Sequence, residues 1–341
     1  MFFRSIGLII ALALPWSATA AEISGKLVVG EQIQWDADPI LDYWLPNNPE
    51  PSTVSQVVTS VVPSSPDSSY QKPRLLKLKS GESSAEILVT VQGMWYQLTR
   101  LDGFSDRSGS TATTRFLSGN RVTTLGYGYG TKSFWFYDST KPFVSYSPIV
   151  DFDINDAFKD KPSGIYTGTM NINVPYQQEV NGRWQKAMLT VPLTVRIEYT
   201  AATLASIDVT GSDILEPNYS GEYVSGKTEY TIKARGVFPN GVSVGLKRSS
   251  DTDGIYRLKP QKGGSTEILY DVTCIECQNN NQFIQNGVAK IDNISNVAKL
   301  NNGTKQEQTM HLNVSYNDKK LSELESDVYQ GAFVLVFEAG L

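Results

Sequence analysis

The residues that most often perform chemistry in proteins are sparse in this chain. His311 is the only histidine, and it lies in "MHLNVSY", where apolar and polar residues alternate as in a β-strand. We interpret it as a strand side chain rather than a catalytic base. No G-x-S-x-G nucleophile turn accompanies it, and a single histidine excludes a His-based zinc site. The sequence therefore predicts a protein that is not an enzyme and has no cofactor. Two carboxylates acting without a metal, as in glycosidases, remain the alternative.

Cys274 and Cys277 are the only cysteines. A C-x-x-C pair can be half of a zinc site or a redox centre. Here the second zinc pair is missing, and the polar "NNNQ" that follows does not resemble the helix that would acidify the first thiol. We predict a small structural disulfide between Cys274 and Cys277 that holds a turn, because the chain carries an export signal.

Two further stretches imitate ligand-binding loops. "DFDIND" (151–156) places oxygen ligands at alternate positions, as a calcium loop does, but Asp156 stands where the glycine is required and Pro162 where the last ligand is required. "GYGYGTKS" (126–133) resembles a phosphate loop but lacks G-K-[ST] and a following helix. We interpret the first as an ordinary loop and the second as a strand or hairpin, so neither predicts a metal or phosphate site.

The N-terminus has the features of a secretory signal peptide, which we place at residues 1–20. Arg4 supplies the positive charge, Ile6 to Leu14 the apolar stretch, and Ala18-Thr19-Ala20 a small-residue cleavage site. The stretch is too short to span a bilayer. The net charge of −5 argues against nucleic acid as a partner. We therefore expect an exported protein.

Apolar runs along the rest of the chain alternate with period two. Examples are "AEILVTV" (85–91), "LTVPLTVRIEYT" (189–200) and "EYTIKAR" (229–235), and clusters of Gly, Pro, Asn, Asp and Ser separate them. This pattern predicts an all-β fold of antiparallel sandwiches. Residues 45–72, rich in Pro, Ser and Asn, are expected to form a long loop.

An internal similarity indicates two sandwich domains. "GIYTGTMNINV" (164–174) and "DVYQGAFVLVF" (327–337) share a Y-x-G pattern followed by alternating apolar residues. We predict an N-terminal domain over 21–203 and a C-terminal domain over 204–341. The second copy would be a strand with one face made of Tyr329, Gly331, Phe333, Leu335 and Phe337.

That C-terminal strand differs from the first copy on its opposite face. Ala332, Val334 and Val336 are apolar, whereas the equivalent positions of the first copy are polar. A strand that is apolar on both faces needs cover on both sides, and an exposed apolar edge invites aggregation. We expect a partner to add a strand there. The alternative is that "ISGKLVVGEQIQW" (23–35) folds back and fills the gap.

The leader peptide, the sandwich pattern and the C-terminal Y-x-G strand resemble subunits of chaperone–usher fimbriae. Segment 162–209 is similar to the domain junction of tip adhesins from the colonisation-factor fimbriae of enterotoxigenic bacteria. The resemblance implies two immunoglobulin-like β-sandwiches, of which the C-terminal one is pilin-like and lacks its last strand. A periplasmic chaperone, an outer-membrane usher and a neighbouring pilin subunit would be the partners in donor-strand complementation.

For function, the resemblance implies a tip adhesin or minor subunit that passes through the periplasm to the fimbrium on the cell surface. Its N-terminal domain would bind a host-cell glycan or glycoprotein. Segment 23–35 offers a different interpretation, because Ile23, Gly25, Leu27 and Val29 lie on one face as in a donor strand. The protein would then be a structural minor pilin or assembly initiator without a receptor site.

Sugars are held by aromatic faces with a few polar groups, and arginine binds carboxylates with two hydrogen bonds. The alternative for each aromatic residue is a core or cross-strand role. The candidates for receptor binding are Trp95, Tyr96, Arg100, Tyr127, Tyr129, Trp135 and Trp184.

Overall fold

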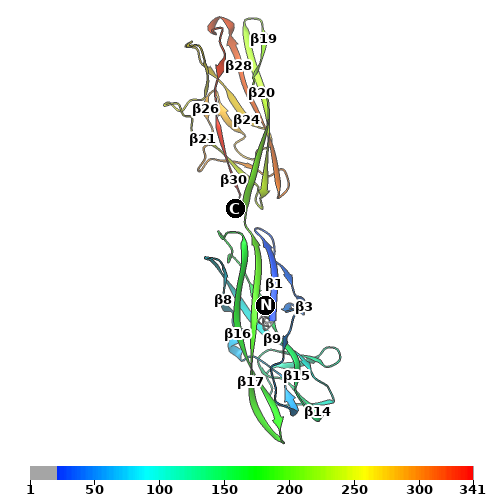
Figure 1. The fold of residues 1–341 in the computed structure, drawn as a ribbon. Coiled ribbons are helices and arrows are strands. Elements are labelled where there is room, and N and C mark those ends of the chain that lie inside the picture. Colours follow the sequence, from blue (N-terminus) through cyan, green and yellow to red (C-terminus); the bar gives the residue numbers. More distant parts are fainter. Residues whose placement is uncertain (1–20, 341) are drawn as a thin grey trace, which may run out of the picture. The chain divides into compact units, whose positions relative to one another are not determined.

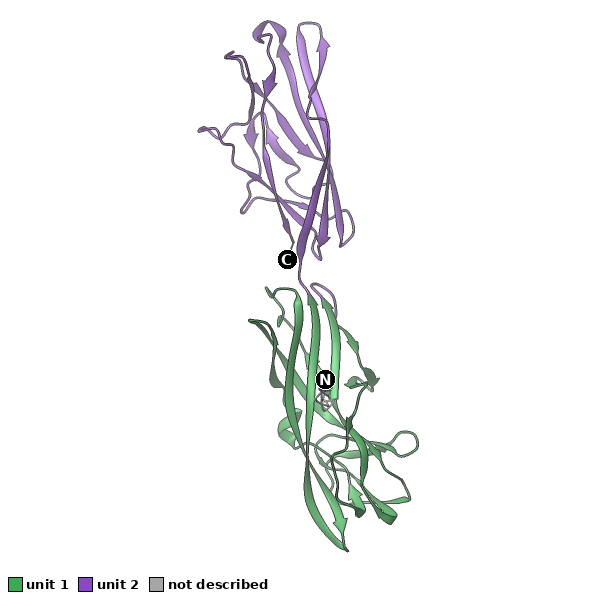
Figure 2. Ribbon diagram, in the orientation of Figure 1, with its two compact units in different colours: residues 1–27, 33–199 green, residues 28–32, 200–341 purple. Residues whose placement is uncertain are grey.

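The structure is a computed structural model that describes residues 21–340. The predicted signal peptide and Leu341 lie outside these residues. The described chain divides into two compact units: unit 1 holds residues 21–27 and 33–199, and unit 2 holds residues 28–32 and 200–340 (Figure 2). Over residues 21–340 the only helices are two 3-10 turns, and no helix has the length and apolar content that a membrane crossing needs. The predicted all-β fold is confirmed.

Unit 1 is built on a network of 15 hydrogen-bonded strands and a two-stranded sheet formed by β7 and β13. Its elements are β1 (Ala21–Val28), β2 (Gln34–Asp36), β3 (Asp38–Ile40), β4 (Tyr43–Leu45), β5 (Glu50–Pro51), β6 (Val58–Val62), β7 (Ser64–Ser65), η1 (Ser68–Gln71), β8 (Arg74–Ser80), β9 (Ser83–Leu98), β10 (Gly103–Asp106), β11 (Thr113–Phe116), β12 (Arg121–Leu125), β13 (Gly128–Tyr129), β14 (Lys132–Thr140), β15 (Phe143–Asp153), β16 (Gly164–Val180) and β17 (Arg183–Thr200). Aromatic contacts join strands of the core. Between ring centroids, Phe143 of β15 lies 5.0 Å from Tyr96 of the neighbouring β9 and 5.5 Å from Tyr176 of β16, which does not pair with β15.

Strand β6 lies inside the segment that the sequence predicts to be a long loop. It pairs with β14 on one side and β16 on the other, and its Val58, Val61 and Val62 are buried. The loop prediction for 45–72 is therefore wrong over residues 58–62. The short run "VTSVV" shows no clean alternation, because a strand that is covered on both faces need not alternate.

Strand β1 is part of unit 1. It pairs with β17 and β2, and alternate side chains, including Ile23 and Leu27, are buried in the unit. The strand within segment 23–35 therefore neither pairs into the C-terminal domain nor stands free as a donor strand. Residues 28–32 group with unit 2, but no strand in the described part of unit 2 pairs with them. Ile23 and Leu27 do lie on one face of a strand, as the alternating sequence predicts, but that face packs on the core of unit 1.

Strands β16 and β17 form a long hairpin, paired along the whole of β16. The hairpin turns at Asn181 and Gly182, whose φ angles of 51° and 71° both lie in the left-handed region. Asn-Gly favours such two-residue turns, because their twist matches that of the paired strands. The tight turn fixes the register, so that Glu179 stands opposite Trp184.

Unit 2 is a sandwich with a core between its sheets. Its elements are β18 (Thr203–Gly211), β19 (Glu216–Ser220), β20 (Tyr223–Val237), β21 (Val242–Lys247), β22 (Arg257–Pro260), β23 (Ile268–Leu269), β24 (Asp271–Cys274), β25 (Gln282–Gln285), β26 (Val288–Ala289), β27 (Ala298–Leu300), β28 (Glu307–Lys320), η2 (Leu321–Glu323), β29 (Tyr329–Gln330) and β30 (Val334–Ala339). The large sheet has the order β18-β20-β28-β24-β25-β26, with β19 also paired to β20, and two three-stranded sheets, β27-β21-β30 and β23-β22-β29, complete the unit.

The C-terminal run "DVYQGAFVLVF" forms two strands where the sequence predicts one. β29 pairs with β22, and β30 pairs with β21. Gly331 lies at the crossing between them, where a Cβ would come within 2.6 Å of the carbonyl oxygen of Arg257. Glycine is therefore required at this position, because the backbone passes too close for any side chain.

Candidate functional site: an open groove in unit 2

Two strands of unit 2, β18 and β30, run side by side with unpaired edges (Figure 1). β18 pairs only with β20, and β30 pairs only with β21. Across residues 21–340 no other strand pairs with the facing edge of either one. The backbone N–H and C=O groups of such an edge can accept a further strand.

The side chains of β18 show that no strand among residues 21–340 covers the inner face of the sandwich at this edge. Ile207 and Val209 stand directly opposite Ala234 and Ile232 of β20, and directly opposite residues project to the same face of a sheet. Ala234 and Ile232 are buried, yet Ile207 is 38% exposed and Val209 is 58% exposed. Both side chains therefore face the interior of the sandwich while remaining open to solvent.

Strand β30 presents the second wall. Leu335 and Phe337 are partly buried and pack against the core of unit 2, and Val334 and Val336 on the opposite face are exposed. Tyr329 and Phe333, which precede β30, pack against the same core. Of the residues that the sequence assigns to one face of an assembly strand, Gly331, Phe333, Leu335 and Phe337 line the space beside β30, whereas Tyr329 of β29 lines a separate pocket.

Between these walls lies a groove with a volume of 470 Å³. Its lining comprises Ile207, Val209, Tyr230, Ile232, Leu312, Gly331, Ala332, Phe333, Val334, Leu335 and Phe337. None of these side chains carries a formal charge. Tyr230 supplies a hydroxyl that donates to Asp213 (3.3 Å), and burial raises the pKa of this tyrosine. An apolar trough between two free strand edges can bind an extended segment with alternating apolar side chains.

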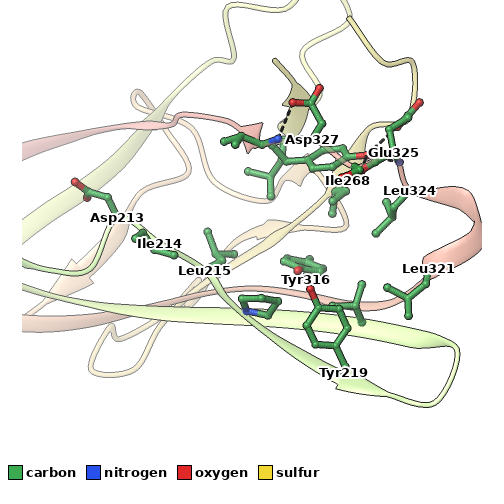
Figure 3. A pocket seen from close by; sticks show the side chains of 16 residues that line it. Asp213, Ile214, Leu215, Tyr219, Ile268, Tyr316, Leu321, Leu324, Glu325 and Asp327 are labelled. Carbon is green, nitrogen blue, oxygen red and sulfur yellow. Dashed lines mark hydrogen bonds between the residues drawn. The ribbon is translucent and has the colours of Figure 1, made fainter. Parts of the chain in front are cut away.

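A second pocket of unit 2, with a volume of 560 Å³, is lined by Tyr316, Ile268 and Leu324, among others (Figure 3). Glu325 at its rim accepts hydrogen bonds from the Tyr329 hydroxyl (2.8 Å) and from backbone N–H groups of the neighbouring loop. The hydrogen bond from Tyr329 is the main reason that the pKa of Glu325 falls to about 2. The carboxylate of Glu325 therefore holds the loop at Ser265 and Thr266 in place, which is a structural role.

The receptor-binding candidates of unit 1 divide into buried residues (Trp95, Tyr96), half-buried residues (Arg100, Tyr129) and exposed residues (Tyr127, Trp135, Trp184). Trp95 is 8% exposed and Tyr96 is fully buried, with its hydroxyl donating to the carbonyl oxygen of Ser64 (2.6 Å). Both belong to the core of unit 1 and cannot contact a receptor from these positions. For these two residues the structure therefore favours the core role, which was the alternative to receptor binding.

The half-buried and exposed candidates lie on different parts of unit 1. Arg100 pairs with Asp102 (2.7 Å) and Asp138 (3.3 Å), so two carboxylates already compensate its charge. Tyr127 is exposed beside β13, which contains Tyr129. Trp135 and Trp184 are exposed, and the register of the strands between them places both on one face of the sheet.

The two cysteines form the predicted disulfide, with a Cα–Cα distance of 5.5 Å. Cys274 ends β24, and Glu276 between the two cysteines accepts from the backbone N–H of His311 (2.7 Å) and contacts its imidazole. His311 lies in β28 opposite Thr231, as a strand residue. Across residues 21–340 no group of three or more His, Cys, Asp or Glu side chains is arranged to hold a metal ion.

The sequence interpretation missed Ile207 and Val209. Their segment, "TLASIDVTG", contains the period-two signal of a strand, since the two residues alternate with polar neighbours. What the segment does not reveal is that their face of the sheet is uncovered. That property depends on which strands flank β18 and β30, and both pairings join residues distant in sequence.

Comparison with known proteins identified similar solved structures only. No family model matches the sequence, and no curated protein matches it. A chaperone–tip adhesin complex of CFA/I fimbriae matches with 13% sequence identity and a TM-score of 0.30. The match covers 94% of this chain and 84% of the other chain. A mutant of the enterotoxigenic E. coli CFA/I adhesin CfaE matches with 10% identity, coverage of 89% and 80%, and a TM-score of 0.34.

A third match is the CsuC–CsuE chaperone–tip adhesion subunit complex of the archaic chaperone–usher Csu pili of Acinetobacter baumannii. Its identity is 11%, it covers 94% of this chain and 99% of the other, and its TM-score is 0.26. The first and third of these solved structures contain a tip adhesin or tip adhesion subunit with its chaperone, and the second contains an adhesin. At such TM-scores they assign no role to any residue of this chain.

Proposed function

We propose that this protein is a two-domain tip adhesin or minor subunit of a chaperone–usher fimbrium, whose unit 2 is completed by a strand from a partner. One observation carries the proposal: Ile207 and Val209 face the interior of the sandwich and are nevertheless exposed. A sandwich with all its strands would bury both side chains. The sequence resemblance to fimbrial subunits supports the same conclusion.

The incoming strand would lie between β18 and β30. Its backbone would pair with the free strand edges and provide affinity, and its alternate side chains would enter the apolar groove and provide specificity. The periplasmic chaperone would supply this strand first and the neighbouring pilin subunit later, with the outer-membrane usher as the site of exchange. Filling the groove would also remove an edge that invites aggregation.

In this proposal the two units have different tasks. Unit 2 anchors the protein in the fibre, and unit 1 attaches the bacterium to a host-cell glycan or glycoprotein. The protein works on the cell surface after passing through the periplasm, and it performs no catalysis. The exposed tryptophans Trp135 and Trp184 support a binding role for unit 1.

The second candidate, a structural subunit or assembly initiator without a receptor site, depends on residues 23–35 acting as a donor strand. Ile23 and Leu27 are buried in unit 1, where β1 pairs with β17. This placement removes the observation that favoured the second candidate. A carbohydrate-active enzyme would need two carboxylates across a pocket, and Asp213, Glu325 and Asp327 do line one pocket of unit 2. They give less support than the open groove, because Glu325 and Asp327 accept hydrogen bonds from Tyr329 and from backbone N–H groups and so hold the neighbouring loop.

The test is thermal unfolding of residues 21–341 with and without a donor strand fused after Leu341. The strand is taken from the major subunit of the same fibre. The matched control carries the same fusion with its alternate apolar residues changed to aspartate. Because a bound strand stabilises only the folded state, the apolar fusion should raise Tm by ten degrees or more, and the aspartate fusion should not. Equal Tm values for all three proteins would refute the proposal.

A further inference from the structure

Two exposed tryptophans of unit 1 lie in one row across four neighbouring strands. Trp135 of β14 stands opposite Ser60 of β6, Ser60 stands opposite Glu179 of β16, and Glu179 stands opposite Trp184 of β17. Directly opposite residues of paired strands project to the same face. All four side chains therefore share one face of the sheet, with an indole at each end of the row.

The spacing and exposure of the indoles suit an extended ligand. Trp135 is 37% exposed and Trp184 is 46% exposed, and three strand spacings separate them, which is about 14 Å. Trp135 packs across Gly103, where a Cβ would clash with the indole, and Tyr137 supports it edge-on with 5.2 Å between ring centroids. Trp135 is thus held in place by its neighbours while part of its surface stays open.

The centre of the row is polar. Glu179 accepts hydrogen bonds through Oε2 from the hydroxyls of Ser60 (2.7 Å) and Thr59 (3.2 Å). Within residues 21–340, no hydrogen-bond partner contacts its Oε1. The two hydroxyls orient the carboxylate, so Oε1 is an acceptor fixed in place between the indoles. A purely apolar partner would leave this acceptor unsatisfied, which is costly.

From this arrangement we infer that the row Trp135–Ser60–Glu179–Trp184 is a binding site for a neutral oligosaccharide. Pyranose rings present apolar C–H faces that stack on indoles and hydroxyls that donate to a fixed carboxylate. One sugar ring cannot cover both indoles, so the ligand has several rings. The inference rests on the proposed attachment function of unit 1 and names the surface and the ligand class.

The charges at the row favour a neutral ligand over an acidic one. An acidic sugar over the centre of the row would meet the negative charge of Glu179 and receive no hydrogen bond from it. Arg107 lies over Trp184, with its guanidinium carbon 5.4 Å from the ring centroid, at one end of the row. Among residues 21–340, no ion pair joins it to Glu179 at the centre.

The experiment measures binding of residues 21–341 to immobilised neutral oligosaccharides and to the same oligosaccharides carrying sialic acid or sulfate. The variants are Trp135→Ala, Trp184→Ala and Glu179→Gln, and the control is Tyr223→Ala, an exposed aromatic residue of unit 2. Each tryptophan variant should weaken binding of neutral oligosaccharides about tenfold, and Glu179→Gln by a similar factor. Tyr223→Ala should have no effect. Trp184→Ala keeps the test valid if Trp135→Ala unfolds, because Trp184 projects from the hairpin end.

Attachment of the wild-type protein to host cells is measured in parallel. Attachment that Trp135→Ala and Trp184→Ala leave unchanged would overturn the inferred site and leave the attachment function standing. Preference for the sialylated or sulfated sugars would overturn the neutral ligand. If the wild-type protein attaches to no cell and binds no sugar, the attachment function itself fails, and the site with it.

Discussion

Val209→Asp tests the open groove most directly, because its effect should depend on whether the groove is filled. Val209 is 58% exposed in β18, and substitutions at exposed positions usually change the free energy of unfolding by less than about 0.5 kcal/mol. The protein without a donor strand should therefore tolerate the change. With a donor strand in place, the same side chain would be covered by apolar groups.

The cost in the filled protein can be estimated from the exposed fraction of Val209. Burying a valine side chain completely contributes about 1.5–3 kcal/mol, so covering the exposed part contributes about 1 kcal/mol, which aspartate loses. Placing the aspartate among apolar neighbours without a partner costs about 1–3 kcal/mol more. The filled protein should lose about 2–4 kcal/mol, and its Tm should fall by about 6–12 °C for a domain of this size.

The assay is thermal unfolding of both forms, with the donor strand fused after Leu341 in the filled form. Val288→Asp is the matched control, since Val288 is a 46% exposed strand valine of unit 2 that does not line the groove. Val288→Asp should change both forms equally. The reasoning is refuted if Val209→Asp also shifts the open and filled forms by the same amount.

Three further predictions concern the fold. Ile23→Ala should destabilise unit 1 by about 2–5 kcal/mol in thermal unfolding, because Ile23 is fully buried in that unit; a free donor strand would show no change. Replacing Cys274 and Cys277 together by alanine should cost unit 2 about 2 kcal/mol, the value expected for so short a closed loop, whereas an unchanged Tm would mean that the disulfide does not constrain the unfolded chain. The pKa of Glu325 is lowered from 4.5 to about 2, so its stabilising effect is complete above pH 4.5 and disappears as the pH falls toward 2. Glu325→Gln should therefore make the loss of Tm between pH 5 and pH 2 less steep, and identical pH profiles would contradict the role assigned to this carboxylate.

Local sequence determines the strands that alternate. Period-two runs such as 189–200 and 229–235 lie in β17 and β20, because one buried face imposes alternation on a strand. It also determines the turn at Asn181-Gly182, where two left-handed residues are needed. The sequence does not reveal β6, because a strand that is covered on both faces need not alternate. The Pro- and Ser-rich residues on either side of it also indicate a loop.

The candidate sites depend on strand pairings between residues far apart in the chain. The sequence alone determines that "AFVLVF" is apolar on both faces and that Trp135 and Trp184 are aromatic. Only the tertiary structure decides that β18 borders the groove, that Trp95 and Tyr96 are buried, and that the two exposed tryptophans share a row with Glu179. The physical reason is that a one-residue change in register moves every side chain of a strand to the other face, and no local pattern fixes the register between distant strands.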